Sequence, residues 1–295
     1  MDGTPTNHTV ASIGMQMIFC PPGTFMMGQD GFAAPVHQVT LTNGFYLGKY
    51  ELTQAQYETV MNGNSEGLNA KPSQWPNNDD RPVEKVSWND AQVFLSRLNS
   101  IEQTAGRLPN DWSYVLPTEA EWEYACRAGT STAYSWGATI ATTNANYSSS
   151  GISQTRDVGQ YAANPWGFFD MHGNVWEWTA DRYQAAYPSG NVTDPTGPAS
   201  GSNWVSRGGS WSHPAPHLRS AMRNAKTPGF QGGGLGIRVG FKVISADEAN
   251  PELELFGGAG ITREAGQPWV EPGVEAHDVR DRYRSGQISV TDIVG

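Results

Sequence analysis

Residues 166–181, WGFFDMHGNVWEWTAD, are the most informative stretch of this 295-residue chain. Asn174 and Glu177 stand three residues apart and offer hard oxygen ligands, and the backbone carbonyls of Gly173 and Val175 lie beside them. These are the donor types that Ca²⁺ takes in proteins, and the flanking tryptophans would exclude water. We therefore predict a calcium ion at this motif. The alternative is that Asn174 and Glu177 only bond the backbone.

Around this motif, residues 130–244 consist mostly of glycines, turn residues and aromatics. A region of this length with sparse secondary structure needs another source of order, such as packed tryptophans, buried Asn and Asp side chains or bound cations. Short strands are expected within WVSRGGSW (residues 204–211) and IRVGFKVI (residues 237–244). We expect these strands to close the sheet.

Before residue 130 the sequence predicts strands and then three helices. Residues 16–28, QMIFCPPGTFMMG, indicate a strand, a turn and a second strand. Thr53, Ser87 and Thr118 are candidate N-caps, since each precedes a pattern with helical spacing. Because this order is neither a βαβ alternation nor all-β, we assign an α+β fold. The residues expected on the buried helix faces are Tyr57, Val60, Met61, Trp88, Ala91, Phe94, Leu95, Leu98, Trp122 and Cys126.

The composition indicates a loop-rich protein whose interior is filled by aromatic side chains. Hydrophobic residues make up 38% of the chain and charged residues 16%, with 34 glycines and 11 tryptophans. A net charge of -10 and the lack of any Lys/Arg-rich run argue against a nucleic-acid partner. No apolar stretch reaches the roughly 18 residues of a membrane span, and the polar start MDGTPTNHTV contains no signal peptide.

The two cysteines, Cys20 and Cys126, form no CxxC pair, so a zinc-ribbon or thioredoxin-like site is excluded. Cys126 falls inside a predicted amphipathic helix, where a buried free thiol is the ordinary interpretation. A disulfide between the two is the alternative that the sequence leaves open.

A second informative stretch is RGGSWSHPAPHLRSAMR, residues 207–223. His213 and His217 are four residues apart, a spacing that makes a metal site on a helix, but Pro214 and Pro216 prevent that helix. Three interpretations stay open for the histidines: a metal site, a surface or ligand-contacting pair, and a buried structural role. Arg219 and Arg223 bond loop carbonyls or bind an anion.

Seven motifs, in this order, resemble the formylglycine-generating enzyme (sulfatase-modifying factor) domain family over residues 14–244. The motifs are GMQMIFCPPGTFMMG, YELTQAQYETVM, PVEKVSWNDAQVFLSRLN, LPTEAEWEYACRAG, WGFFDMHGNVWEWTAD, RGGSW and LGIRVGFKV. The resemblance implies an irregular C-type-lectin-like fold with little regular secondary structure and with bound calcium.

The resemblance also bears on the chemistry, because the family's enzymes oxidise a substrate cysteine with copper(I) held by two thiolates. Those thiolates follow the RGGS turn, and soft Cu(I) requires such soft ligands. Here Ser210 matches the family's active-site serine, His213 stands at the first cysteine position, and no cysteine follows Cys126. This argues against copper and against oxidase activity. The family cleft would be lined by Ser210, Trp211, His213, His217 and Arg219.

The resemblance further implies a second calcium site, which Asn146 and the carbonyl of Tyr147 match. Its acidic member is replaced near Ser150.

The tail divides into an acidic linker, residues 245–258, and residues 259–295, which resemble the start of a bacterial Ig-like surface module. Arg282 stands where that module's pattern has glycine. A sandwich of this class needs about 100 residues, so we predict a partial module. Such modules belong to exported multidomain proteins, and this favours an extracytoplasmic or secreted location with further domains in a longer chain.

The sequence therefore predicts a secreted, calcium-stabilised binding or structural module without oxidase activity. Its ligand would be an unidentified protein, peptide or glycan. The alternatives are an enzyme of unknown reaction that uses the cleft around Ser210, His213 and His217, and a formylglycine-generating oxidase.

Overall fold

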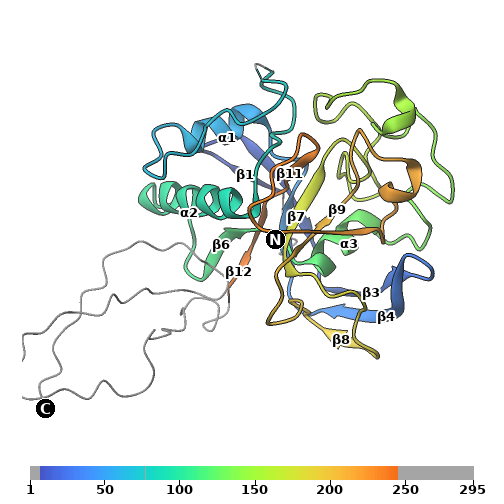
Figure 1. The fold of residues 1–295 in the computed structure, drawn as a ribbon. Coiled ribbons are helices and arrows are strands. Elements are labelled where there is room, and N and C mark those ends of the chain that lie inside the picture. Colours follow the sequence, from blue (N-terminus) through green and yellow to red (C-terminus); the bar gives the residue numbers. More distant parts are fainter. Residues whose placement is uncertain (1–6, 77, 245–295) are drawn as a thin grey trace, which may run out of the picture. The chain divides into compact units, whose positions relative to one another are not determined.

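The computed structural model describes residues 7–76 and 78–244, which form three β-sheets and three α-helices (Figure 1). The predicted linker (245–258) and the predicted Ig-like module (259–295) lie outside the described residues. The helices are α1 (Gln54–Met61), α2 (Trp88–Thr104) and α3 (Glu119–Arg127), with 3-10 turns η1 (Ser148–Ser150) and η2 (Ala215–Leu218). The strands are β1 (His8–Val10), β2 (Met15–Cys20), β3 (Gly23–Gln29), β4 (Ala33–Leu41), β5 (Phe45–Gly48), β6 (Trp112–Val115), β7 (Trp176–Arg182), β8 (Val192–Thr193), β9 (Trp204–Arg207), β10 (Arg223–Lys226), β11 (Leu235–Ile237) and β12 (Gly240–Val243).

The first sheet is antiparallel, in the order β1-β2-β5-β12-β6. Helix α2 packs against β6, and α1 lies beside α2 (Figure 1). Their buried apolar side chains join those of the sheet in one core, in which the Tyr57 and Phe94 rings stack at 5.4 Å.

The second sheet has the order β10-β9-β7-β11 and occupies the middle of the described fold (Figure 1). Strands β7 and β9 are antiparallel, whereas β11 runs parallel to β7. The expectation that residues 204–211 and 237–244 close one sheet is wrong. Strands β9 and β11 belong to this sheet, and β12 lies inside the first one, because the chain changes sheets at Arg238 and Val239. The third sheet, β3-β4-β8, is small.

All three helices begin at the predicted N-caps. The hydroxyls of Thr53, Ser87 and Thr118 each accept from the backbone N–H three residues on, and each helix has a complete capping box. A capping box satisfies two backbone donors that the first turn leaves open, so these short local signals fix the helix starts. Every residue of α3 is buried, including its three glutamates.

Both cysteine thiols are free and fully buried. Cys20 and Cys126 lie in a core formed by α3 and strands β2 to β5, with Trp122 and Phe168. Burial raises the pKa of Cys126 to about 12 and that of Cys20 well above its ordinary value. The thiolate forms of both residues are therefore disfavoured.

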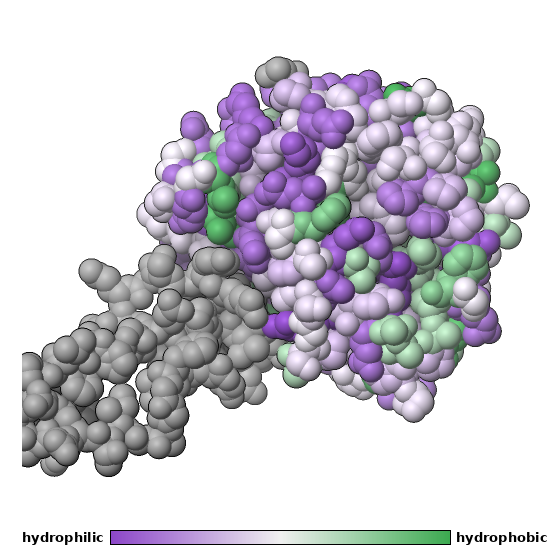
Figure 2. All heavy atoms as spheres, viewed as in Figure 1, coloured by the Kyte–Doolittle hydropathy of each residue, from purple (hydrophilic) through white to green (hydrophobic). Residues whose placement is uncertain are grey.

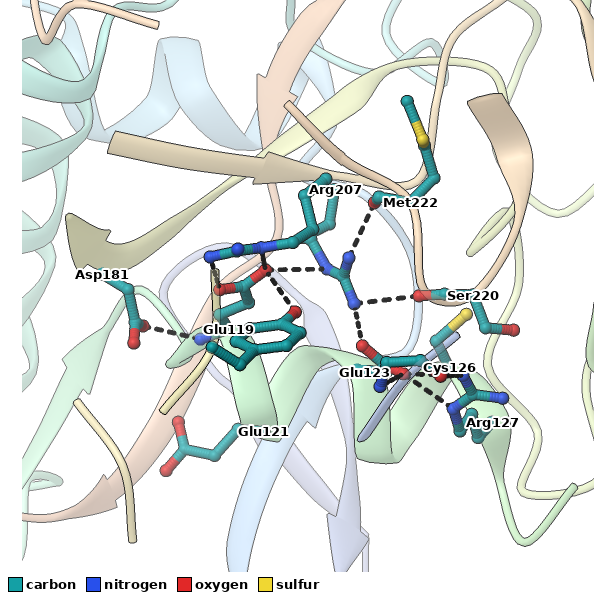
Figure 3. Close-up of polar contacts among 12 residues, drawn as sticks. Glu119, Glu121, Glu123, Cys126, Arg127, Asp181, Arg207, Ser220 and Met222 are labelled. Carbon is teal, nitrogen blue, oxygen red and sulfur yellow. Dashed lines mark hydrogen bonds and ion pairs between the residues drawn. The ribbon is translucent and has the colours of Figure 1, made fainter. Parts of the chain in front are cut away.

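A buried ion network joins α3 to the loop that follows β9 (Figure 3). The guanidinium of Arg207 pairs with the Glu123 carboxylate, and it also donates to the carbonyls of Ser220 (2.9 Å) and Met222 (2.7 Å). Arg127 pairs with Glu123 at 2.7 Å. Arg207 and Glu123 have no solvent exposure, so their charges depend on each other.

The face drawn in Figure 2 is covered mostly by hydrophilic and neutral residues, with hydrophobic ones in small separate groups. Among residues 7–76 and 78–244, no helix is both long and apolar enough to cross a membrane.

We expect Glu123→Gln to destabilise the fold by about 3 kcal/mol, because it leaves the buried guanidinium of Arg207 with only the more distant carboxylate of Glu119 (3.7 Å). Urea unfolding followed by fluorescence measures the loss. The control is Glu58→Gln, which removes a surface pair with Lys71 (2.8 Å) and should leave the midpoint unchanged. Equal midpoints for native protein and Glu123→Gln would contradict the role assigned to the network.

Candidate functional site

The RGGS turn after β9 depends on two glycines with positive φ, Gly208 (96°) and Gly209 (79°). A Cβ on Gly209 would lie 2.8 Å from the His217 carbonyl oxygen and 2.8 Å from the Leu218 side chain. Only glycine fits this backbone at that distance. The turn therefore brings η2 against Ser210.

The segment before β7 holds this loop through backbone hydrogen bonds. The N–H of Gly173 donates to the Gly208 carbonyl (2.8 Å), and the N–H of Trp211 donates to the Asn174 carbonyl (2.9 Å). His172 is buried and its Nδ1 contacts the Leu218 carbonyl at 2.7 Å, so Nδ1 carries the proton. Burial lowers the pKa of His172 to about 4, and the ring stays neutral.

Ser210, His213 and Trp176 meet at one imidazole nitrogen. The indole N–H of Trp176 donates to His213 Nδ1 (3.3 Å), and the Ser210 hydroxyl lies 2.8 Å from the same atom. An indole nitrogen only donates, so Nδ1 is the acceptor and the proton of neutral His213 sits on Nε2. The Ser210 hydroxyl accordingly donates to His213.

His217 lies against the same residues. Its ring centroid is 5.2 Å from that of His213 and 6.3 Å from that of Trp176. Pro214 precedes η2, and the segment forms a 3-10 turn in place of an α-helix, as the prolines predict. Burial, followed by the nearby His217 and Lys226, lowers the pKa of His213. Within the described ranges, no three His, Cys, Asp or Glu side chains come together to hold a metal ion.

We call Ser210, His213, His217, Trp176, Trp211 and Trp75 the Ser210 cluster. The Trp211 indole donates to the Gly233 carbonyl (2.8 Å), and its ring meets Trp75 edge-on at 5.1 Å. The predicted members Ser210, Trp211, His213 and His217 are therefore neighbours. The structure adds Trp176 and Trp75.

Glu84 holds the turn that carries Trp75. One carboxylate oxygen accepts from the backbone N–H groups of Gln74 (2.5 Å) and Trp75 (3.3 Å), and the other is buried without a partner among the described residues. Burial raises the pKa of Glu84 to about 7.

The fifth predicted cleft residue, Arg219, makes its contacts elsewhere, against Phe32 and Tyr134. Arg223 is structural: it forms two hydrogen bonds with the carboxylate of Glu119, at 2.6 and 2.7 Å.

The predicted calcium ligands are engaged by protein groups. The Asn174 side-chain oxygen accepts from the backbone N–H of Arg156 (2.9 Å) and the amide of Asn146 (3.2 Å). Both carboxylate oxygens of Glu177 accept from Arg238, at 2.7 and 2.9 Å. Gly173 precedes Asn174 and Val175 follows it, and the Val175 N–H donates to a carboxylate outside the motif.

That carboxylate is Glu51, which the sequence reasoning missed. It accepts from Val175 (3.0 Å) and from the Asn174 amide (2.6 Å). Burial raises the pKa of Glu51 well above its ordinary value, and Asp170 and Glu177 raise it further. Among the described carboxylates, Arg238 pairs with Glu177 alone, and Glu51 and Asp170 act on the pKa of Arg238 only through their charge.

The carboxylates and other oxygen donors around Asn174 suit a divalent cation, whereas the Asn174 side-chain oxygen already accepts from two N–H groups. The predicted second site, at Asn146 and Tyr147, forms a local turn: Ser150 donates its hydroxyl to the Asn146 side-chain oxygen (3.0 Å) and the Tyr147 carbonyl (2.6 Å).

Comparison with known proteins identifies the family. Residues 4–243 match the model of the sulfatase-modifying factor enzyme 1-like domain. The chain belongs to this family. Mouse formylglycine-generating enzyme is 29% identical, in an alignment that covers 76% of this chain and 74% of that protein. The serine/threonine-protein kinase pkn1 of Chlamydia caviae is 31% identical over 76% of this chain and 37% of its own length.

Among solved structures, Treponema denticola variable protein 1 superposes with a TM-score of 0.69. It is 29% identical in sequence, and the match covers 80% of this chain and 99% of that one. The predicted α+β, C-type-lectin-like fold of the formylglycine-generating enzyme type is confirmed.

The sequence could have indicated some of the missed residues but not others. Asp170 stands in the same motif as Asn174, so it could have been predicted as a neighbour of the site. Glu51, Glu84 and Trp75 come from other motifs, and only the folded chain brings them to the site.

We expect His213 to titrate below pH 6.5 as the Nε2–H tautomer, because Nδ1 accepts from Trp176. Protonation would turn Nδ1 into a donor and break this contact, so the Trp176 indole N–H resonance should move with the same midpoint. Long-range ¹H–¹⁵N NMR of the imidazoles measures both.

His217→Gln is the matched variant for this titration. It removes a neighbouring cation that lowers the pKa of His213, so the midpoint should rise. A proton on Nδ1 of neutral His213 would show the deduced hydrogen bond to be wrong.

Proposed function

We propose that this chain is a secreted ligand-binding or structural module that uses the family scaffold without oxidase activity. The observation that supports this is the chemistry after the RGGS turn. Hydroxyl, imidazole and indole groups stand there, whereas both thiols of the chain are buried in another core.

Copper(I) held by two thiolates does not fit these residues. Cys20 and Cys126 have no solvent exposure, and burial opposes their ionisation. The nitrogen of His213 that faces Ser210 already accepts hydrogen bonds. No oxidative step is therefore assigned to this chain.

The Ser210 cluster has the features of a recognition site. The partly buried rings of Trp75, Trp211, His213 and His217 offer flat faces, and aromatic faces of this kind bind sugar rings and peptide side chains. The ligand class is accordingly a protein, peptide or glycan. The secreted location rests on the resemblance of the tail to an exported module.

Family membership alone leaves the activity open, because relatives named formylglycine-generating enzyme and serine/threonine-protein kinase are both similar to this chain. A second candidate is an enzyme that uses Ser210 as nucleophile and His213 as base, since the two lie 2.8 Å apart. Ser210 has no solvent exposure, so a substrate would not reach its hydroxyl in this conformation. We therefore place ligand binding first.

The proposal predicts binding that depends on the two histidines, with no oxidation. On glycan and peptide arrays, the native protein should bind a ligand that the His213→Gln/His217→Gln variant does not. Neither protein should convert a cysteine-containing peptide to formylglycine when copper(I) is supplied. His8→Gln, which changes a partly buried histidine in β1, is the control and should bind as the native protein does.

Formylglycine formed by the native protein would overturn the proposal. Array binding that survives the double variant would exclude the Ser210 cluster as the ligand site.

We also propose that calcium stabilises the fold at the predicted motif of Asn174 and Glu177. The support is electrostatic: Glu51 contacts Asn174, the charges of Asp170 and Glu177 raise the pKa of Glu51, and a bound Ca²⁺ would offset this negative charge with oxygen ligands. Calcium would supply charge neutralisation there, while the chain's own Arg238 continues to orient Glu177.

Calcium should therefore raise the melting temperature, and a chelator should lower it, because a ligand that binds only the native state stabilises it. Asp170→Asn should abolish this response while it keeps an oxygen to accept from the Gly159 N–H (2.6 Å in the native protein). Magnesium is the control ion. Identical melting in calcium and in chelator would remove calcium from the proposal.

A further inference from the structure

We propose that Arg219, together with Phe32 and Trp136, binds a carboxylate ligand whose body is a flat ring. The inference does not depend on the Ser210 cluster, because the side-chain contacts of Arg219 involve none of its members. It adds a second recognition site with its own ligand chemistry.

Arg219 differs from the other described arginines in forming no side-chain hydrogen bond or ion pair, whereas even Arg97 and Arg156, which have no carboxylate partner, bond other groups. Its Nε is buried without a partner among the described residues. The residue as a whole is partly exposed. The arginines paired with a glutamate are Arg107, Arg127, Arg207, Arg223 and Arg238.

Aromatic rings hold the guanidinium of Arg219 in place. Its central carbon lies 4.5 Å from the centroid of the Phe32 ring and 5.9 Å from that of Tyr134. A cation over such rings is attracted by their negative faces but keeps its N–H donors. The fork of Arg219 is therefore oriented before any ligand arrives, which lowers the entropic cost of binding.

Two large aromatic side chains are exposed around this cation. Phe32 is 41% exposed and Trp136 is 37% exposed. The Trp136 ring stacks on Tyr134 at 5.4 Å, with 3° between the planes, so Tyr134 contacts both Trp136 and Arg219. The exposed rings of Phe32 and Trp136 lie near the unpaired guanidinium of Arg219. This combination suits a ligand with an anionic group at one end and a flat ring at the other.

The backbone beneath the site is fixed by hydrogen bonds. The Tyr134 hydroxyl donates to the Ala215 carbonyl (2.8 Å), the Ser220 N–H donates to the Ala133 carbonyl (2.9 Å), and the Trp136 indole donates to the Thr139 carbonyl (2.9 Å). The rings and the guanidinium therefore keep their relative positions.

A carboxylate is the anion that this geometry favours. The two terminal nitrogens of a guanidinium donate in parallel to its two oxygens, and such charge-assisted pairs are stronger than neutral ones. The ring attached to the carboxylate would lie on Phe32 or Trp136. Two sources share this chemistry, a uronic acid of a glycan and an aromatic acid.

Isothermal titration calorimetry of the full chain with glucuronate and with benzoate tests the proposal. We expect at least one to bind, and its neutral counterpart, glucose or benzyl alcohol, not to bind. Arg219→Gln should weaken binding by about tenfold or more, the factor expected for a lost charge-assisted pair. Arg219→Lys keeps the charge without the fork and should fall between the two.

Arg107→Gln is the matched control, because it removes an arginine that pairs with Glu102 (2.7 Å) and should leave binding unchanged. Melting curves establish that each variant is folded. Binding of glucuronate alone would identify a glycan ligand, and binding of benzoate alone an aromatic acid. The proposal is overturned if neither acid binds, if the neutral counterparts bind equally, or if folded Arg219→Gln binds like the native protein.

Discussion

The buried pair of Arg207 and Glu123 is the interaction on which the irregular half of this fold depends. Glu123 lies on α3 and Arg207 ends β9, so the pair ties a helix to the middle sheet. The same guanidinium holds the carbonyls of Ser220 and Met222. A charge removed from water needs partners of fixed geometry, and the pair therefore fixes the far end of the loop that begins at Arg207.

The first part of this loop is held from the other side by backbone pairing with residues 172–174. Gly173 and Asn174 bond Gly208 and Trp211, and His172 bonds Leu218. Buried backbone groups need partners, and a loop-rich region without regular ladders obtains them from side chains and from isolated pairs. This explains how a chain with sparse secondary structure keeps a rigid Ser210 cluster. It also explains why the motif at 166–181 and the RGGS turn occur together.

The sequence predicted what is local and missed what is assembled over distance. The capped helices followed from Thr53, Ser87 and Thr118, because each capping box lies within four residues. Strand β7 was not predicted, although Trp176 to Asp181 alternates apolar and polar side chains. The polar ones, Glu177, Thr179 and Asp181, are buried as well, which the alternation does not indicate. Glu51 and Arg238 reach the Asn174 motif from 123 and 61 residues away. Contacts between residues so far apart in the sequence cannot be predicted from local residue spacing.

The 3-10 turn η2 separates two environments within three residues. His217 faces Trp176 and His213, Leu218 packs in the core with Tyr134, and Arg219 lies on the outer rings. The buried Leu218 side chain and the hydrogen bond from His172 to the Leu218 carbonyl fix the backbone here. The side chains of His217 and Arg219 are therefore not needed to hold it. A loop held in this way separates stability from recognition, because its backbone is fixed by Leu218 and His172 while the neighbouring side chains are left to vary.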